Sequence, residues 1–109
     1  MTTVRKVLGQ QAPAATTDTT LYTVPSSTST VCSTLMVANR GPSSATFRVA
    51  VRPDGAALAN AHYIYHGVSC PAGDAFAATL GVTLDAADVV TVWASNDNLS
   101  FSLFGEESS

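Results

Sequence analysis

The chain has 109 residues, of which 12% are charged and 46% hydrophobic, whereas roughly 25% charged residues are usual in soluble domains. Its length is that of one domain, and its net charge of -3, with five scattered basic residues, excludes the basic patch that nucleic-acid binding requires. The sequence contains no apolar run near the roughly 18 residues of a membrane span, so no membrane partner is expected.

Hydroxyl side chains take the place of charges in this composition. The chain contains fourteen Thr and twelve Ser, and its only lysine is Lys6. β-Proteins commonly guard exposed strand edges with charges, above all with lysine. We therefore expect other subunits to cover part of this surface, in a homo-oligomer that is a dimer or a trimer.

The first segment of the chain allows two interpretations. Residues 2–8 and 19–24 have the pattern of strands, and a run rich in Thr, Ala and Pro separates them. Residues 1–18 are therefore either an extended arm or a first strand plus a linker, and residues 19–109 form the main domain. Arg5 and Lys6 precede two apolar residues, as in a signal peptide, but Gly9 ends the apolar run, so no export signal is expected.

The clearest strand covers residues 45–52, where Phe47, Val49 and Val51 alternate with polar positions. Residues 31–39 are apolar on both parities, which predicts a central strand or one that is covered on both faces. The loop between these two strands contains Gly41 and Pro42. This arrangement predicts a hairpin.

The second half of the chain repeats the pattern of short strands and turns. Residues 52–55 match a type I turn, and one helical turn follows within residues 56–61. Strands are predicted at residues 62–66, 75–82, 88–95 and 99–104, although Asp74 could instead cap a short helix at the second of these. The last two strands form a predicted second hairpin, with Leu99, Phe101 and Leu103 inward. The whole is an all-β chain, a single antiparallel β-sandwich of about eight strands.

Residues with catalytic or ligand chemistry are present but do not form a recognisable site. His62 and His66 would share a metal ion on a helix, but on a strand they lie about 13 Å apart. Cys32 and Cys70 have no nucleophile motif around them, and the interpretation of two reduced thiols is preferred to a disulfide. We therefore expect that the protein is not an enzyme and that it binds neither a metal ion nor a cofactor.

Two arginines and one tryptophan are candidates for contact with a partner. Arg48 and Arg52 share the outward face of their strand, where they are either solvated, ion-paired, or in contact with another subunit. Trp93 is either a core residue or, if exposed, a binding anchor. Asp88 is expected to cap a turn rather than to bind calcium with Asp85.

Several segments, spread over nearly the whole chain, resemble small structural proteins that tailed bacteriophages encode. These segments are residues 2–10 (TTVRKVLGQ), 20–25 (TLYTVP), 39–41 (NRG), 46–52 (TFRVAVR), 56–59 (AALA), 62–64 (HYI) and 88–92 (DVVTV). They are segments that build a fold and include no catalytic motif. The resemblance implies a non-enzymatic virion subunit, assembled in the host cytoplasm, that decorates or cements the head or serves as a tail, baseplate or fibre accessory.

The partners implied are the chain itself and a major capsid protein or a tail or baseplate protein. The expected contacts are Arg5 and Lys6 in the N-terminal segment, and Arg48 and Arg52 on the outward strand face. Deletion of residues 1–15 is then expected to abolish particle binding and to leave the sandwich folded. The alternative is a glycan- or receptor-binding sandwich whose stacking platforms are Tyr63, Tyr65 and Trp93, exposed in one cluster.

Overall fold

Eight antiparallel strands form two four-stranded sheets in the computed structural model, which describes residues 2–109. Sheet A has the strand order β1-β8-β3-β6, and sheet B has the order β2-β7-β4-β5. The all-β sandwich of about eight strands is thus confirmed. The strands are β1 (Thr3–Gln11), β2 (Thr19–Thr23), β3 (Ser29–Asn39), β4 (Ala45–Arg52), β5 (Tyr63–Cys70), β6 (Ala75–Leu84), β7 (Val89–Ala94) and β8 (Leu99–Ser108), and two short 3-10 turns, η1 (Pro53–Gly55) and η2 (Asn60–His62), join β4 to β5.

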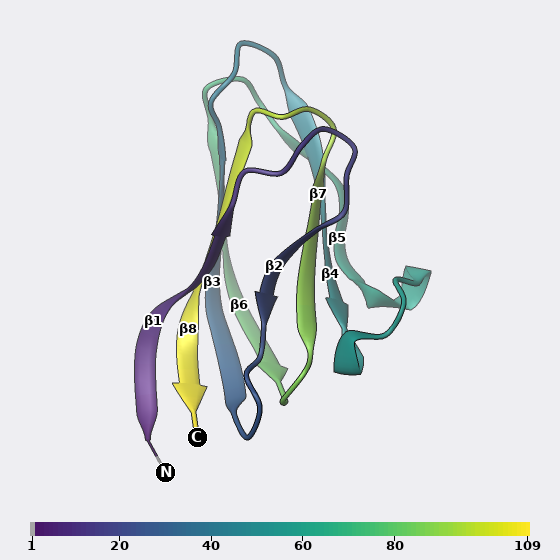
Figure 1. The fold of residues 1–109 in the computed structure, drawn as a ribbon. Helices are drawn as coiled ribbons and strands as arrows, with labels where there is room; N and C mark the ends of the chain where they lie inside the picture. The colour runs from purple at the N-terminus through teal and green to yellow at the C-terminus, as the bar shows by residue number, and fades with distance from the viewer. Residues whose placement is uncertain (1) are drawn as a thin grey trace.

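The two sheets face each other and enclose one core, as Figure 1 shows. Phe47 of β4 lies at the centre of this core with no exposed surface, and its ring centroid is 5.2 Å from that of Phe76 and 5.8 Å from that of Phe101. The alternation in residues 45–52 placed Phe47 and Val49 correctly on the inner face. The inward direction of Leu99, Phe101 and Leu103 is confirmed as well, since each is at most 1% exposed.

The chain crosses between the sheets at almost every connection. Only β4 and β5 are consecutive in sequence and also neighbours in one sheet. Eight strands in this order form a jelly roll, in which two Greek keys wrap around a common core. Both predicted hairpins are therefore wrong, because β3 and β8 belong to sheet A whereas β4 and β7 belong to sheet B.

A buried asparagine explains why the connection after β3 does not close a hairpin. Asn39 is 4% exposed, and its side-chain amide donates hydrogen bonds to the carbonyls of Ser43 (2.9 Å) and Cys70 (3.0 Å). Its side-chain oxygen accepts a hydrogen bond from the Gly41 amide at 2.9 Å. The Asn39 side chain thereby ties the end of β3 to its own loop and to the end of β5 in the opposite sheet. The Asn-Arg-Gly-Pro segment serves as a bridge between the layers.

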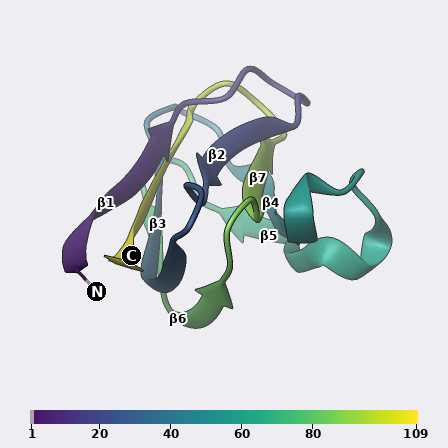
Figure 2. The ribbon, with the colours of Figure 1, turned by 60° about the horizontal axis from the view of Figure 1, so that its bottom comes forward.

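The turn after β4 also differs from the prediction. Asp54 and Gly55 both have positive φ, at 54° and 69°, and the Ala56 amide donates a hydrogen bond to the Pro53 carbonyl at 2.9 Å. Positive φ at both central residues characterises a type I′ turn, in which Asp-Gly is favoured. The predicted type I turn at residues 52–55 is therefore wrong in type and lies one residue too early. Figure 2 shows how the connection from β4 to β5, with η1 and η2, projects beside sheet B.

The N-terminal segment is an edge strand in this structure. Residues 3–11 form β1, which pairs with β8 from Thr3 opposite Ser108 to Gln11 opposite Phe101. Leu8 sits at a bulge in this strand, belongs to the core cluster and is 9% exposed. Of the two interpretations of residues 1–18, the structure has the first strand plus a linker for the residues it describes.

Strand β3 is central in sheet A, between β8 and β6, as its apolar sequence predicted. It is not covered on both faces, however, because Val31 and Met36 point outward and are 44% and 39% exposed. Val7 of β1 is also exposed, at 47%. The outer face of sheet A therefore combines hydroxyl side chains with isolated aliphatic ones.

Candidate functional site

The outer face of sheet B carries the two arginines that sequence analysis singled out. Arg48 and Arg52 alternate with core residues of β4 and therefore point away from the core, as predicted. In the register of the sheet, Arg48 lies opposite Trp93 of β7 and opposite His66 of β5, and Arg52 lies opposite Val89. We name Arg48, Ala50, Arg52, Thr91 and Trp93 the arginine face.

Arg48 lies over the ring of Trp93. The guanidinium carbon is 4.0 Å from the ring centroid, which is the geometry of a cation–π contact. The contact covers one face of the indole, and Trp93 is half-buried. Trp93 is thus neither of the two predicted alternatives, since it is an outward residue that a neighbouring arginine partly covers.

Between the two arginines lies a small buried patch on what would otherwise be open sheet surface. Ala50 and Thr91 are directly opposite each other in the register, point outward, and are only 1% and 6% exposed. The Thr91 hydroxyl, the Arg48 Nε and the Arg52 Nε are all buried and have no hydrogen-bond partner. An unsatisfied buried donor costs roughly 1–3 kcal/mol, so three of them together mark an unusual surface.

The charge balance singles out the same two arginines. Arg5 and Lys6 pair with Glu106 (3.4 Å) and Glu107 (3.3 Å), and one Nη of Arg40 donates to the Asp97 carbonyl at 2.9 Å. Within residues 2–109, Arg48 and Arg52 take part in no ion pair and no side-chain hydrogen bond. The four strands of sheet B contain neither Asp nor Glu. A guanidinium binds carboxylate well because its N–H groups match two oxygens at once.

The other predicted contact residues lie elsewhere. Arg5 and Lys6 belong to β1 at the edge of sheet A, so the structure does not bring them together with Arg48 and Arg52. Arg5 is 89% exposed in its side chain and, with Val31, Phe104 and Glu106, borders a shallow hollow of about 540 Å³ on the outer face of sheet A. The four predicted residues thus form two separate surfaces, one on each sheet.

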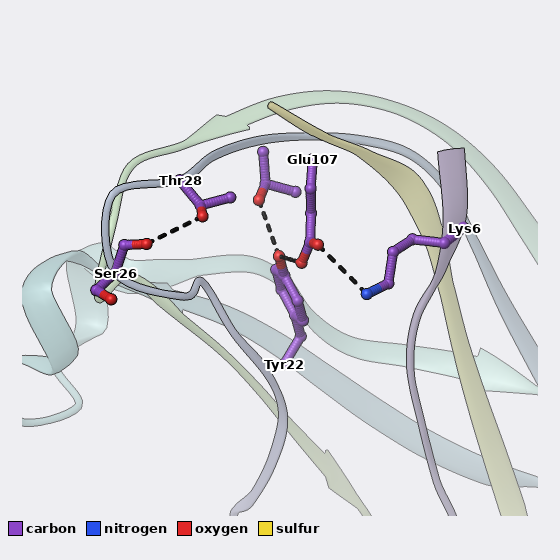
Figure 3. Close-up of polar contacts among 6 residues, drawn as sticks. Lys6, Tyr22, Ser26, Thr28 and Glu107 are labelled. Carbon is purple, nitrogen blue, oxygen red and sulfur yellow. Dashed lines mark hydrogen bonds and ion pairs between the residues drawn. The ribbon is translucent and has the colours of Figure 1, made fainter. Parts of the chain in front are cut away.

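A polar cluster that sequence analysis missed closes the end of the sandwich where the termini meet (Figure 3). The Tyr22 hydroxyl of β2 donates a hydrogen bond to Glu107 Oε2 at 2.5 Å and lies 2.8 Å from the Thr30 hydroxyl. Because the tyrosine proton goes to the carboxylate, Thr30 donates to the tyrosine oxygen. Lys6 holds the other oxygen of Glu107. The cluster joins β1, β2, β3 and β8.

Burial and the hydrogen bond from its hydroxyl to Glu107 raise the pKa of Tyr22 well above its usual value. The same hydrogen bond, with help from Lys6, holds the pKa of Glu107 below its usual range. One sequence signal could have located this cluster. The Arg5-Lys6 and Glu106-Glu107 pairs at the two ends of the chain are complementary in an antiparallel arrangement.

The Tyr22→Phe variant is expected to lose about 1–3 kcal/mol of unfolding free energy near neutral pH, since it removes a hydrogen bond to a charged group. The lowered pKa of Glu107 contributes stability above the unfolded pKa of roughly 4.3, and this contribution is lost as the pH falls through the folded value. The raised pKa of Tyr22 contributes stability below about pH 10, which is lost as the pH rises towards the folded value. Denaturant unfolding at acid, neutral and alkaline pH should show that the loss of stability in acid and the loss of stability in alkali are both weaker in the variant. If the unfolding free energy of Tyr22→Phe depended on pH in the same way as that of the unchanged chain, the Tyr22–Glu107 hydrogen bond would be contradicted as the cause.

The aromatic side chains of the glycan alternative do not share a surface. Tyr65 points inward, where its ring centroid is 5.6 Å from that of Phe76. Tyr63 packs edge to face on His66 at 4.9 Å, and Trp93 lies under Arg48. The structure therefore does not assemble these three rings into the exposed cluster that the alternative requires.

The histidines and cysteines are likewise apart. His62 ends η2, where its Nδ1 accepts a hydrogen bond from the Ala59 amide at 3.1 Å, while His66 belongs to β5. Residues 2–109 contain no group of three or more His, Cys, Asp or Glu side chains that could hold a metal ion. Asp88 caps its turn as predicted, since its carboxylate accepts hydrogen bonds from the amides of Asp85 (2.8 Å) and Asp54 (2.9 Å).

Both thiols are free and buried. Cys32 lies seven residues before Asn39 on β3, which is about 23 Å along an extended strand. The Asn39 side chain donates a hydrogen bond to the carbonyl of Cys70. The two thiols therefore lie at opposite ends of the sandwich. Burial raises the pKa of Cys32 to about 11 and also raises the pKa of Cys70. At neutral pH both sulfurs are therefore protonated and weakly nucleophilic.

None of the helical segments in the described part of the chain is long and apolar enough to cross a membrane. The chain matches no protein-family model and no curated protein.

Proposed function

We propose that the protein is a non-enzymatic structural subunit of a tailed-phage virion, attached to another protein of the particle through the arginine face. Decoration or cementing of the head is preferred to a role as tail, baseplate or fibre accessory. The observation that carries the proposal is the pair Arg48 and Arg52, two guanidinium groups on a strand face without carboxylates and with buried, unpartnered Nε atoms. A surface of this kind gains hydrogen bonds when a partner supplies acceptors.

The fold is compatible with this role. Jelly rolls occur in viral capsid domains and in lectin domains, so the topology agrees both with a particle subunit and with the glycan-binding alternative. A slender body of 45 × 27 × 19 Å, with a strand at one edge that contains only uncharged residues, is suited to packing between larger subunits. The low charge of the chain would limit its solubility alone and matters less when its faces are covered.

The chemistry of the arginine face favours an acidic attachment partner. Two guanidinium groups, one of them held in place by Trp93, would receive two carboxylates of a neighbouring protein. The Thr91 hydroxyl between them would donate to a carboxylate or a backbone carbonyl. We therefore assign as partner an acidic surface segment of the major capsid protein or of a tail or baseplate protein.

The direct test is to look for the chain in purified particles. Tailed particles from the source of the sequence would be separated on a density gradient, and the chain quantified against the major capsid protein by mass spectrometry. The proposal expects a fixed stoichiometric ratio, and labelling with antibodies under the electron microscope would distinguish head from tail. Absence of the chain from intact particles would overturn the proposal.

The arginine face itself is tested by rebinding to particles that lack the chain. The double variant R48A/R52A is expected to bind roughly 100-fold more weakly, because truncation of a buried charge partner costs about 2–5 kcal/mol. The control R40A removes a positive charge from another surface and should bind like the unchanged chain. Equal losses in both variants would show general electrostatic attraction instead of a contact at this face.

A further inference from the structure

Strand β6 is the least protected edge of the sandwich. The four edge strands are β1 and β6 in sheet A, and β2 and β5 in sheet B. Strand β1 carries Arg5 and Lys6, β2 has only five residues, and β5 is interrupted by bulges at Ile64 and at Gly67, whose φ is 71°. Charges, shortness and bulges are the usual means of keeping an edge from pairing with another chain.

Strand β6 has ten residues with neither charge nor proline. A bulge at Leu80 and Gly81 interrupts its pairing with β3, but Ala75–Thr79 pairs regularly with Thr34–Ala38. Alternate residues of this uncharged segment therefore direct their backbone N–H and C=O groups to the free side without interruption by a bulge. Such an edge is a template for one more antiparallel strand.

The side of the sandwich between β5 and β6 is also incompletely closed. Phe76, Leu80 and Val82 of β6, with Tyr65 and Val68 of β5, pack on the core but are only partly buried. Ile64 is 41% exposed at the same side. Neither β5 nor β6 contains Asp, Glu, Lys or Arg, whereas the opposite edge, β1, carries two cations. The uncharged edge of β6 therefore lies at the same side of the sandwich as the incompletely covered part of the core.

We propose that β6 pairs antiparallel with β6 of a second copy of this chain, so that two A sheets join into one sheet of eight strands. Directly opposite residues must lie on the same face of the sheet, which allows only registers with residues of equal parity opposite each other. Among these registers, the one with Ala77 on the two-fold axis uses all five residues of the regular segment. Ala75 then faces Thr79 of the second copy, and Ala77 faces its own equivalent.

The side chains are complementary to themselves in this register. On the inner face, Phe76 lies opposite Ala78 of the second copy, so each large ring meets a small side chain at both ends of the contact. On the outer face, Ala75, Ala77 and Thr79 are exposed and uncharged, and no like charges meet. The Phe76 ring, already 5.2 Å from Phe47 in its own core, would gain cover from the second copy. A contact of this length belongs to the small class of interfaces, and we expect a micromolar dissociation constant.

The self-pairing depends only on the β6 edge and holds whether or not the chain is a particle subunit. Sedimentation equilibrium of the purified chain is expected to show a concentration-dependent dimer. Hydrogen exchange of the Ala75–Thr79 amides should slow as the concentration rises. A chain that stays monomeric at millimolar concentration, or that forms a trimer, would overturn the proposal, and particle composition would be unaffected by this result.

Substitution on the two-fold axis makes the test specific. A77K and A77E would each place two like charges directly opposite each other and raise the dissociation constant at least tenfold. An equimolar mixture of A77K and A77E would restore dimers, because opposite charges then meet at the axis. The control M36K adds a lysine on the neighbouring strand, directly beside Ala77 on the same face, and should dimerise like the unchanged chain. Failure of the mixture to dimerise, or unchanged dimerisation of A77K alone, would contradict the register.

Discussion

Removal of residues 1–15 is expected to unfold the protein or to leave it as an aggregating, partly folded chain. The deletion takes away the whole of β1, which pairs with β8 along its length, and removes Leu8 from the core and the buried Pro13. It also turns β8 into an exposed edge. The structure therefore reverses the expectation from sequence that this deletion leaves the sandwich folded. Far-ultraviolet circular dichroism and thermal unfolding of the truncated chain provide the measurement.

Two single substitutions in the same strand separate the loss of the core from the loss of the edge. Leu8→Ala is expected to cost about 2–5 kcal/mol, as for other buried leucines. Val7→Ala, at a residue that is 47% exposed, should change stability by at most about 0.5 kcal/mol. If the truncated chain kept a cooperative transition like that of the full chain, the N-terminal segment would be an arm after all.

Phe47→Ala is expected to destabilise the fold by about 3–5 kcal/mol, a large share of the roughly 5–15 kcal/mol that holds most domains folded. Phe47 has no exposed surface and contacts the rings of Tyr65, Phe76 and Phe101, which come from both sheets. The cavity left behind could not collapse without moving strands of both layers. Denaturant unfolding monitored by Trp93 fluorescence would give the free-energy difference.

The matched control is Phe104→Ala, which removes a ring of the same size from the outer face of sheet A. Phe104 is half-buried beside the shallow hollow that Arg5 and Val31 border. A ring that is already half in contact with water contributes less when it is lost, so the cost should be well under half of that at Phe47. Equal costs at both positions would mean that the outer face is covered in solution, in line with a subunit packed on it.

The site shows how far residue types alone can lead. The alternation in β4 placed Arg48 and Arg52 on the outward face, and this placement is confirmed. The burial of Thr91, the position of Arg48 over Trp93 and the unpartnered Nε atoms were not predictable, because they depend on which strand lies beside β4. The cluster of Tyr22 and Glu107 escaped notice for the same reason, since 85 residues separate its two members.

Strand content, face and core positions followed from the sequence alone. Alternation with a period of two is a local property, and it predicted the strand Ala45–Arg52 with the observed bounds. Apolar runs, strand propensity and turn residues predicted the other strands, which are local signals as well. The partners of the strands were decided only in three dimensions. The short loops favoured hairpins within one sheet. Each sheet, however, can bury its apolar face only against the other sheet. Connections that cross from one sheet to the other, such as the loop that Asn39 anchors, bring the two faces together. Strand pairing depends on which distant segments bury their apolar faces together in one core, and no local sequence pattern contains that information.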